Sequence, residues 1–189
     1  MKEMGGMNNT IRTNFDGLWS GDRELQNRAF GTILEITDRP VDWAYGVWDE
    51  LVENLHHKDN HNRAIAAQVL CNLAKSDPRN RMQKDFVTLL AVTKDERFVT
   101  ARHCMQALWK VGAAGKEQQV LLVDGLEARF KECATEKNCT LIRYDILQSL
   151  RNLYDSVKDE SIRAKALELI EIEEDAKYRK KYAGLWRAR

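Results

Sequence analysis

The sequence predicts an all-α protein built from about four antiparallel helix pairs stacked on one another. Apolar residues recur three and four positions apart along most of the chain, which is the period of an amphipathic helix. No stretch shows the alternating pattern of a strand bounded by turn dipeptides. A short motif of small and aliphatic residues also returns at a nearly constant interval, as it does in proteins made of helical repeats.

The repeated motif has a mostly small residue first, an aliphatic residue four positions later and another three positions after that. It occurs at Ala29-Ile33-Ile36, Ala66-Leu70-Leu73, Cys104-Leu108-Val111 and Ile146-Leu150-Leu153. The first members are 37, 38 and 42 positions apart, counted from 29 to 66, 66 to 104 and 104 to 146. Helix pairs that stack at such a period bury a continuous core. We expect this core to contain Ala66, Leu70, Leu73, Cys104, Leu108, Val111, Leu150 and Leu153.

Each motif marks the second helix of a pair, and a bulkier first helix is expected before it. The expected first helices cover about 9–19, 42–56, 78–92 and 117–132. Start signals agree with this division, because Asp77-Pro78 is typical of an N-cap followed by proline in the first turn, and Asp159 suits a further N-cap. A last helix at about 160–182 lacks a partner and is predicted to cap the C-terminal end. The expected organisation is a flexible N-terminus at 1–8, one helical domain at 9–183 and a tail at 184–189.

Composition narrows the classes of function. The 189 residues are 43% hydrophobic, which is enough for a core, and 30 Lys and Arg balance 29 Asp and Glu to a net charge of +1. Whole-molecule attraction to nucleic acids or anionic lipids is therefore weak, and electrostatic recognition must depend on local patches. The first nine residues lack the apolar run of a signal peptide or anchor, and no later run is long enough to span a bilayer. These features predict a cytoplasmic protein.

The four cysteines follow neither a CxxC pattern nor a secretory signal, so reduced thiols are expected. Cys71 and Cys104 lie within apolar helical patterns and are interpreted as core residues. Cys133 and Cys139 flank the loop ATEKN, where a disulfide or metal site is the less favoured alternative.

The segments DERFVTARHCMQALWKVG (95–112) and NRAIAAQVLCNLAKSDP (62–78) resemble the second helix of HEAT repeats, in which an acidic turn residue precedes an arginine, a small residue and spaced aliphatic residues. The resemblance covers about residues 10–175 and implies a right-handed α-α superhelix, the HEAT-like solenoid. The arginine usual near the start of that helix is matched by Arg63, Arg143 and Arg163, whereas Gln26 and Ala101 stand at the corresponding places elsewhere. The ladder of arginine and aspartate typical of the family is therefore expected to be incomplete.

A polar stripe runs along the second helices, opposite the apolar one. Two positions after the small residue stand Gly31, Gln68, Gln106 and Gln148, and positions four before or after these lie on the same helix face. Second helices usually line the inner wall of a solenoid, so these residues are expected to form a solvent-facing binding wall. An ordinary solvated face is the alternative. The predicted wall consists of Gln68, Asn72, Arg102, Gln106, Lys110, Tyr144, Gln148 and Asn152.

Three other clusters favour structural roles over functional ones. His56, His57, Asp59 and His61 lie in one turn, yet their spacing is not that of a known metal motif, so Asp59 is interpreted as a helix cap and no metal is expected. Trp43, Tyr45 and Trp48 are interpreted as core packing, with a pocket as the alternative. In the last helix, acidic residues from Glu171 to Asp175 precede basic ones such as Lys177, an order that suits the helix dipole. A nucleic-acid or partner-docking tip is the alternative there.

No P-loop, GxSxG or Rossmann glycine pattern occurs, so catalysis has no positive support and no cofactor is expected. The sequence favours a non-enzymatic scaffold that binds a protein or peptide through the second helices. The alternative is a DNA-binding or DNA-repair protein of the alkylpurine glycosylase type, which uses a similar helical-repeat architecture. A structural subunit that pairs through an exposed apolar edge is a third reading.

Overall fold

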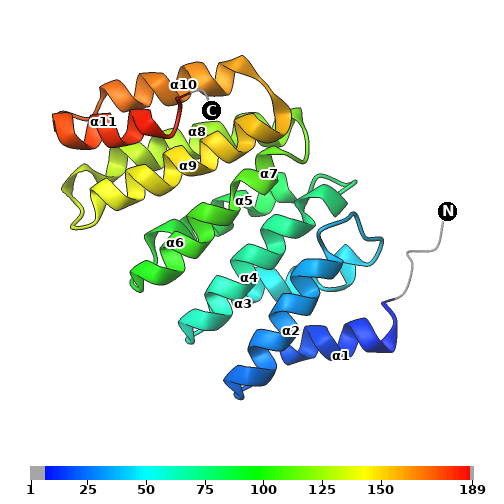
Figure 1. Ribbon diagram of the computed structural model, residues 1–189. Helices are drawn as coiled ribbons and strands as arrows, with labels where there is room; N and C mark the ends of the chain where they lie inside the picture. Colours follow the sequence, from blue (N-terminus) through cyan, green and yellow to red (C-terminus); the bar gives the residue numbers. More distant parts are fainter. Residues whose placement is uncertain (1–6, 188–189) are drawn as a thin grey trace. The chain divides into compact units, whose positions relative to one another are not determined.

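The computed structural model describes residues 7–187, which contain eleven α-helices, four short 3-10 helices and no strand. The predicted all-α class is confirmed (Figure 1). Within the described residues, none of the helices has the length and apolar content needed to cross a membrane. The chain forms two compact units, Met1–Cys104 and Met105–Arg189, and the division between them falls inside helix α6.

The first unit is a series of helix pairs joined by short turns. Helix α1 packs against α2, α3 packs against α4, and α2 and α4 lie side by side (Figure 1). The elements of this unit are α1 (Asn9–Gly17), α2 (Arg23–Ile36), η1 (Ala44–Gly46), α3 (Trp48–Asn54), α4 (Asn60–Leu73), η2 (Ala74–Ser76), α5 (Met82–Ala91), η3 (Val92–Lys94) and the larger part of α6 (Phe98–Ala107).

The second unit is built around its longest helix, α9, against which α7, α8, α10 and α11 all pack. Helix α10 also contacts α8, and α11 also contacts α10. The elements are α7 (Trp109–Gly112), α8 (Lys116–Glu132), η4 (Cys133–Thr135), α9 (Cys139–Val157), α10 (Glu160–Glu171) and α11 (Ala176–Gly184).

Helix starts are defined by side chains that accept the otherwise unpaired amide hydrogens of the first turn. Asp59 accepts from the amide of His61 and Asp159 from that of Ser161, so the two caps predicted at these positions are confirmed. Asp22 and Asp175 cap α2 and α11 in the same way.

All eight residues expected in the core are buried, and each of them is fully inaccessible to solvent. The aromatic side chains of Trp43 and Trp48 are also buried, as the core interpretation predicted. The indole nitrogen of Trp48 donates to Asp85, 2.8 Å away, and so remains hydrogen-bonded inside the core.

Two first helices begin later than predicted. The helix expected over 42–56 begins at Trp48, because the chain from Trp43 to Gly46 forms a 3-10 turn in which the Gly46 amide donates to the Trp43 carbonyl. Glycine destabilises the interior of an α-helix, so the segment that contains Gly46 forms a single 3-10 turn in place of an α-helix. The helix expected over 78–92 begins at Met82, because the Asp77 carboxylate accepts from the amides of residues 81 and 82. Pro78 therefore lies in the turn before the helix.

The last predicted helix, 160–182, is two helices. Helix α10 ends at Glu171, because the side chain of Glu173 points into the protein and forms a salt bridge of 2.9 Å with Arg143. Both of these side chains are largely buried. Asp175 then caps α11. Trp186, expected in the tail, is also buried, and its ring contacts Tyr154 of α9.

The expectation that all cysteines are reduced is wrong for one pair. Cys133 and Cys139 form a disulfide with their Cα atoms 5.1 Å apart. The 3-10 turn after α8 brings the two residues together, and a salt bridge between the buried Arg129 and Glu136 holds the same loop. Cys71 and Cys104 are free and buried, as expected.

Candidate functional site

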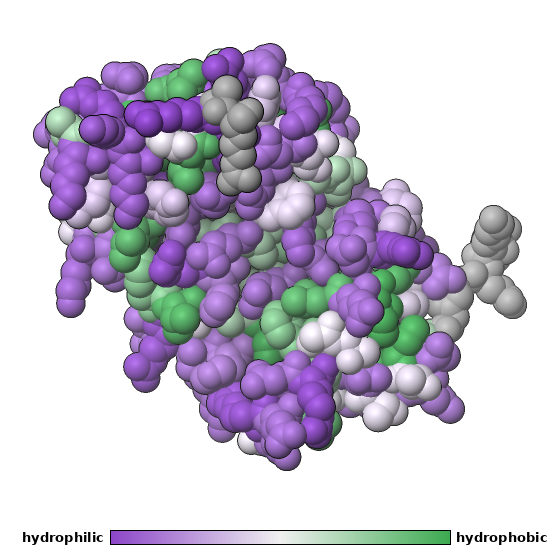
Figure 2. Space-filling view, viewed as in Figure 1, coloured by the Kyte–Doolittle hydropathy of each residue, from purple (hydrophilic) through white to green (hydrophobic). Residues whose placement is uncertain are grey.

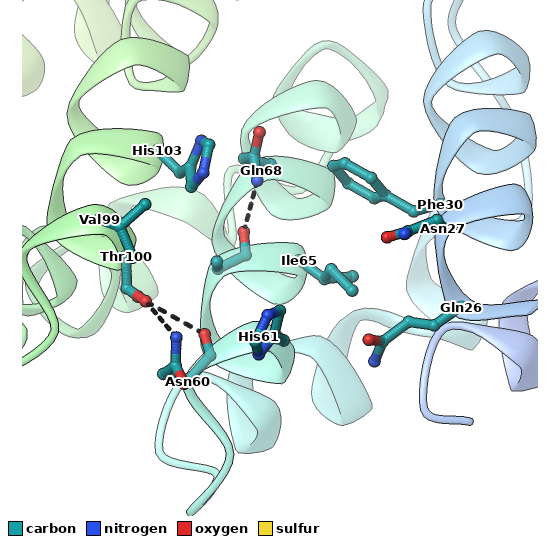
Figure 3. Close-up of a pocket in the computed structure, with 11 residues that line it drawn as sticks. Gln26, Asn27, Phe30, Asn60, His61, Ile65, Gln68, Val99, Thr100 and His103 are labelled. Carbon is teal, nitrogen blue, oxygen red and sulfur yellow. Dashed lines mark hydrogen bonds between the residues drawn. The ribbon is translucent and has the colours of Figure 1, made fainter. Parts of the chain in front are cut away.

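A groove on the first unit lies between α2, α4 and the first turns of α6. Its cavity has a volume of about 190 Å³. Figure 3 shows α4 in the centre, with Phe30 and Asn27 of α2 on one side and His103 and Val99 of α6 on the other. The groove is lined by Gln26, Asn27, Phe30, Asn60, His61, Ala64, Ile65, Gln68, Val99, Thr100 and His103.

The floor of the groove is apolar. Ile65 and Ala64 are buried on α4, Phe30 is half-buried on α2, and Val99 of α6 is 56% exposed. The Val99 side chain and the partly exposed Phe30 ring, on opposite sides of α4 (Figure 3), provide apolar surface that is open to solvent. The surface over α2 and α4 shows apolar areas between polar side chains (Figure 2).

Uncharged polar groups surround this floor. Asn60 donates its side-chain amide to the Thr100 hydroxyl at 3.3 Å, and that hydroxyl donates to the Asn60 carbonyl at 3.2 Å, which ties the start of α4 to α6. Gln68 donates to the carbonyl of Ala64 at 3.0 Å, and its carbonyl oxygen carries no described partner. The exposed imidazoles of His61 and His103 complete the rim.

The lining contains no Lys, Arg, Asp or Glu. Charges near the groove are instead used between helices. Arg23 forms a salt bridge of 2.6 Å with Asp59. Arg63 donates two hydrogen bonds, of 2.6 and 2.8 Å, to the carboxylate of Asp95. Burial raises the pKa of Asp59, but the His61 amide and Arg23 outweigh this effect and lower the pKa to about 2. These carboxylates stay charged and are paired outside the groove lining.

The structure places three of the predicted wall residues in the first unit. Gln68 is half-buried and lines the groove, and Arg102 is half-buried on α6. Asn72 does not face solvent, and the prediction is wrong for this residue. It is 1% exposed, and its side-chain amide donates to the Thr37 hydroxyl at 3.1 Å and the Leu34 carbonyl at 3.3 Å. Asn72 connects α4 to α2, because the close approach of these helices covers the stripe at this point.

The other five wall residues lie in the second unit. Gln106 is exposed and its amide is 3.4 Å from the buried Asp145, and Lys110 lies beside the Trp109 ring. Tyr144, Gln148 and Asn152 are half-buried along one face of α9.

Gln148 and Asn152 line a second cavity, of about 340 Å³, between α9 and the end of α11. Gln148 donates to Asn152 at 2.9 Å. Arg151 also lines the cavity and joins the two elements by donating to the Leu185 carbonyl at 3.0 Å. The remaining lining residues are Asp155, Gly184, Leu185 and Arg187.

The histidine cluster has a structural role around a helix start. The His57 ring nitrogen accepts from the Asp59 amide at 3.0 Å, and Asp59 accepts from the His61 amide at 2.9 Å. Across residues 7–187, no three histidine, cysteine or acidic side chains are grouped to hold a metal ion.

The polar stripe identified Gln68 but missed most of the groove. Among the missed residues, His61, Ile65, Val99 and His103 lie one position after the stripe and are four residues apart on their helices, whereas Asn27 and Ala64 lie on the stripe itself. Asn60 and Thr100 left no such signal, because their pairing depends on how α4 and α6 approach each other.

Comparisons with known proteins were made on the chain and on its structure. No protein-family model matches the sequence, and no curated protein matches it. An engineered protein whose crystal structure was determined by the Northeast Structural Genomics Consortium is similar, with 17% sequence identity and a TM-score of 0.49. The similarity covers 94% of this chain and 95% of that chain. The function is therefore inferred from the two cavities.

Proposed function

We propose that this protein is a non-enzymatic interaction module of the HEAT-like solenoid type that binds a peptide segment in the groove between α2, α4 and α6. The observation that carries the proposal is the groove lining, in which an apolar floor is surrounded by amide and imidazole groups without any charged side chain. This arrangement suits a peptide that places one apolar side chain on the floor of the groove. The main-chain amides of the peptide then hydrogen-bond to the donors and acceptors around the floor.

The size of the cavity supports a peptide rather than a cofactor. A volume of about 190 Å³ is below the roughly 300 to 1,000 Å³ of pockets that enclose drug-sized ligands. It suits one medium-sized apolar side chain, with the flanking main chain running over Gln68, Asn60 and Asn27. Phosphate contacts of a nucleic acid require Lys or Arg, which this lining lacks, so the groove favours a peptide over DNA.

The experiment is a selection of random peptides displayed on phage, followed by titration of the selected peptides against two variants. Val99→Lys places a charge beside the floor, and we expect it to weaken binding at least about tenfold because the ammonium group must be desolvated when the peptide binds. Val87→Lys is the matched control, because Val87 of α5 is 74% exposed and lies outside the groove lining.

The selected peptides should share one aliphatic or aromatic residue between uncharged neighbours. Equal binding to the wild type, Val99→Lys and Val87→Lys proteins would place the binding surface elsewhere. A consensus of acidic residues would also contradict the proposal, because no cation lines the groove.

A further inference from the structure

A second surface with different chemistry lies on the other unit, where α11 packs against α9. Helix α11 carries Lys177, Lys180 and Lys181 on its exposed face together with Gly184. The buried Tyr182 lies on the opposite face and anchors the helix by donating to the Thr140 carbonyl at 2.8 Å. The three lysines therefore project from a fixed helix.

These cations are not used to hold the fold together. Among the described residues, no carboxylate pairs with Lys177, Lys180, Lys181 or Arg187. Arg179 is the basic residue of α11 that does form an ion pair, with Glu171 at 3.8 Å. The acidic residues before α11 thus leave the exposed lysines uncompensated, and this part of the surface is positive although the net charge of the chain is only +1.

Aromatic rings lie directly beside the lysines. The Lys181 ammonium group is 4.9 Å from the ring centre of Tyr144, and that of Lys177 is 5.8 Å from the ring of Tyr178. Both tyrosines are half-buried and pack around Tyr182, with ring centres 6.5 and 6.3 Å from it. Their positions are fixed by this packing, while part of each ring remains accessible.

The surface continues along α9 into the polar cavity of about 340 Å³. Tyr144, Gln148 and Asn152 are spaced four residues apart and so follow one helix face. Beyond the tyrosine, the cavity presents two side-chain amides and the guanidinium group of Arg187, while the Arg151 guanidinium is paired with the Asp155 carboxylate at 2.8 Å. Its volume falls within the range that encloses a molecule of nucleotide size.

We propose that the seam between α9 and α11, formed by Tyr144, Gln148, Asn152, Lys177, Lys180, Lys181 and Arg187, binds single-stranded nucleic acid. The cations contact phosphates, Tyr144 offers a ring on which an unpaired base stacks, and the amides meet base edges in the cavity. Grooves for single strands combine these groups.

Other anionic partners fit this surface less well. A membrane would require large apolar side chains to insert, but the exposed residues of α11 are three lysines, Ala176 and Gly184 (Figure 2 shows mainly hydrophilic residues over α10 and α11). An acidic peptide would use the lysines but has no planar group for the tyrosine ring. Paired bases in a duplex are already stacked and offer no face to it.

The test measures fluorescence anisotropy of a labelled oligouridylate of about 12 nucleotides, within the roughly 4 to 16 that such grooves cover. Binding should weaken as salt rises. The triple variant Lys177→Gln, Lys180→Gln, Lys181→Gln should reduce the slope of log affinity against log salt by about 2, because each lost phosphate contact on a single strand removes about 0.7. The matched control is Lys58→Gln, Lys84→Gln, Lys94→Gln on the first unit, which changes the net charge equally and should leave the slope unaltered.

A second variant separates stacking from charge. Tyr144→Leu keeps an apolar side chain beside Tyr182 and should weaken oligouridylate binding roughly tenfold, with an unchanged salt slope. Circular dichroism checks that each variant is folded.

The proposal is overturned if the control triple variant loses as much binding as the α11 variant. It is also overturned if an oligoglutamate peptide, a duplex of equal length or phosphatidylserine vesicles bind as well as the oligouridylate. Absence of binding at low ionic strength would also overturn it. The peptide selection on the first unit is unaffected by any of these outcomes.

Discussion

Two side-chain amides one turn apart on α4, those of Gln68 and Asn72, have different roles because they lie in different surroundings. Gln68 lines the groove and bonds only within its own helix, to the carbonyl of Ala64. Asn72, one turn later, is buried and donates to two groups of α2. One amide is therefore available to a ligand, and the other holds two helices together.

Truncation of each amide should separate these tasks. We expect Asn72→Ala to destabilise the protein by about 1 to 3 kcal/mol, because the hydroxyl of Thr37 and the carbonyl of Leu34 lose a buried partner. Gln68→Ala should change the free energy of unfolding by no more than about 0.5 kcal/mol. Urea denaturation of the two variants measures this difference, and equal effects would contradict the assignment of Asn72 to the helix interface.

Leu108 tests the predicted core. It is fully buried at the junction of α6 and α7, and it is the central member of the third repeat motif. Leu108→Ala should cost about 2 to 5 kcal/mol, as removal of a buried leucine side chain leaves a cavity. Val120→Ala on α8, where the valine is 60% exposed, is the control and should stay within about 0.5 kcal/mol of the wild type. A small effect of Leu108→Ala in chemical denaturation would mean that this part of the core is loosely packed.

At the scale of elements, helix contacts in the first unit depend on small residues at the points of closest approach. Helix α1 ends at Gly17, and a Cβ atom added there would lie 2.9 Å from the Cβ of Ala29 in α2. The alanine carbon has no rotamer to change, so the two helices would have to separate. The small first member of the repeat motif is thus explained here by contact with α1.

Gly17→Ala should therefore destabilise the protein by about 1 to 3 kcal/mol, the usual cost of overpacking. Helix propensity alone would predict that Gly17→Ala stabilises the protein, since alanine favours a helix more than glycine does. Gly31→Ala, at a helical position with open space around its Cα, is the matched control and should be neutral or stabilising. Thermal unfolding followed by circular dichroism distinguishes the two signs.

At the scale of the whole molecule, paired carboxylates in both units link stability to pH. Hydrogen bonding to Arg81 lowers the pKa of Asp49, and hydrogen bonding to Lys116 lowers that of Asp159. The pKa of Asp59 is about 2, below its ordinary value of 3.8. A folded-state pKa below the unfolded value means that the stabilisation is complete above the unfolded pKa and is lost as pH falls through the folded pKa.

We therefore expect the free energy of unfolding to be constant down to about pH 4 and then to fall steadily towards about pH 2. Asp59→Asn should make this fall shallower, because asparagine retains the capping function without titrating. Urea midpoints measured across this range test the expectation. Parallel curves for the wild type and Asp59→Asn would show that Asp59 does not contribute to the pH dependence.

The sequence by itself determined the helical class, the core residues and the caps at Asp59 and Asp159. These features depend on interactions within a few residues along the chain, so spacing and residue type suffice to predict them. Helix boundaries were less well predicted. Glu173 ends a helix by pairing with Arg143, 30 residues away, and Asp77 accepts from the hydroxyl of Tyr45 as well as from the amides of residues 81 and 82.

Only the tertiary structure decided which polar residues face solvent and which face another helix. Asn72 and Gln68 occupy the same predicted stripe, yet α2 covers one and leaves the other at a groove. The disulfide between Cys133 and Cys139, the pairing of Asn60 with Thr100 and the seam between α9 and α11 likewise arise where segments meet. The physical reason is that helical periodicity defines a direction around one helix axis, whereas exposure depends on the distance and angle of the next helix.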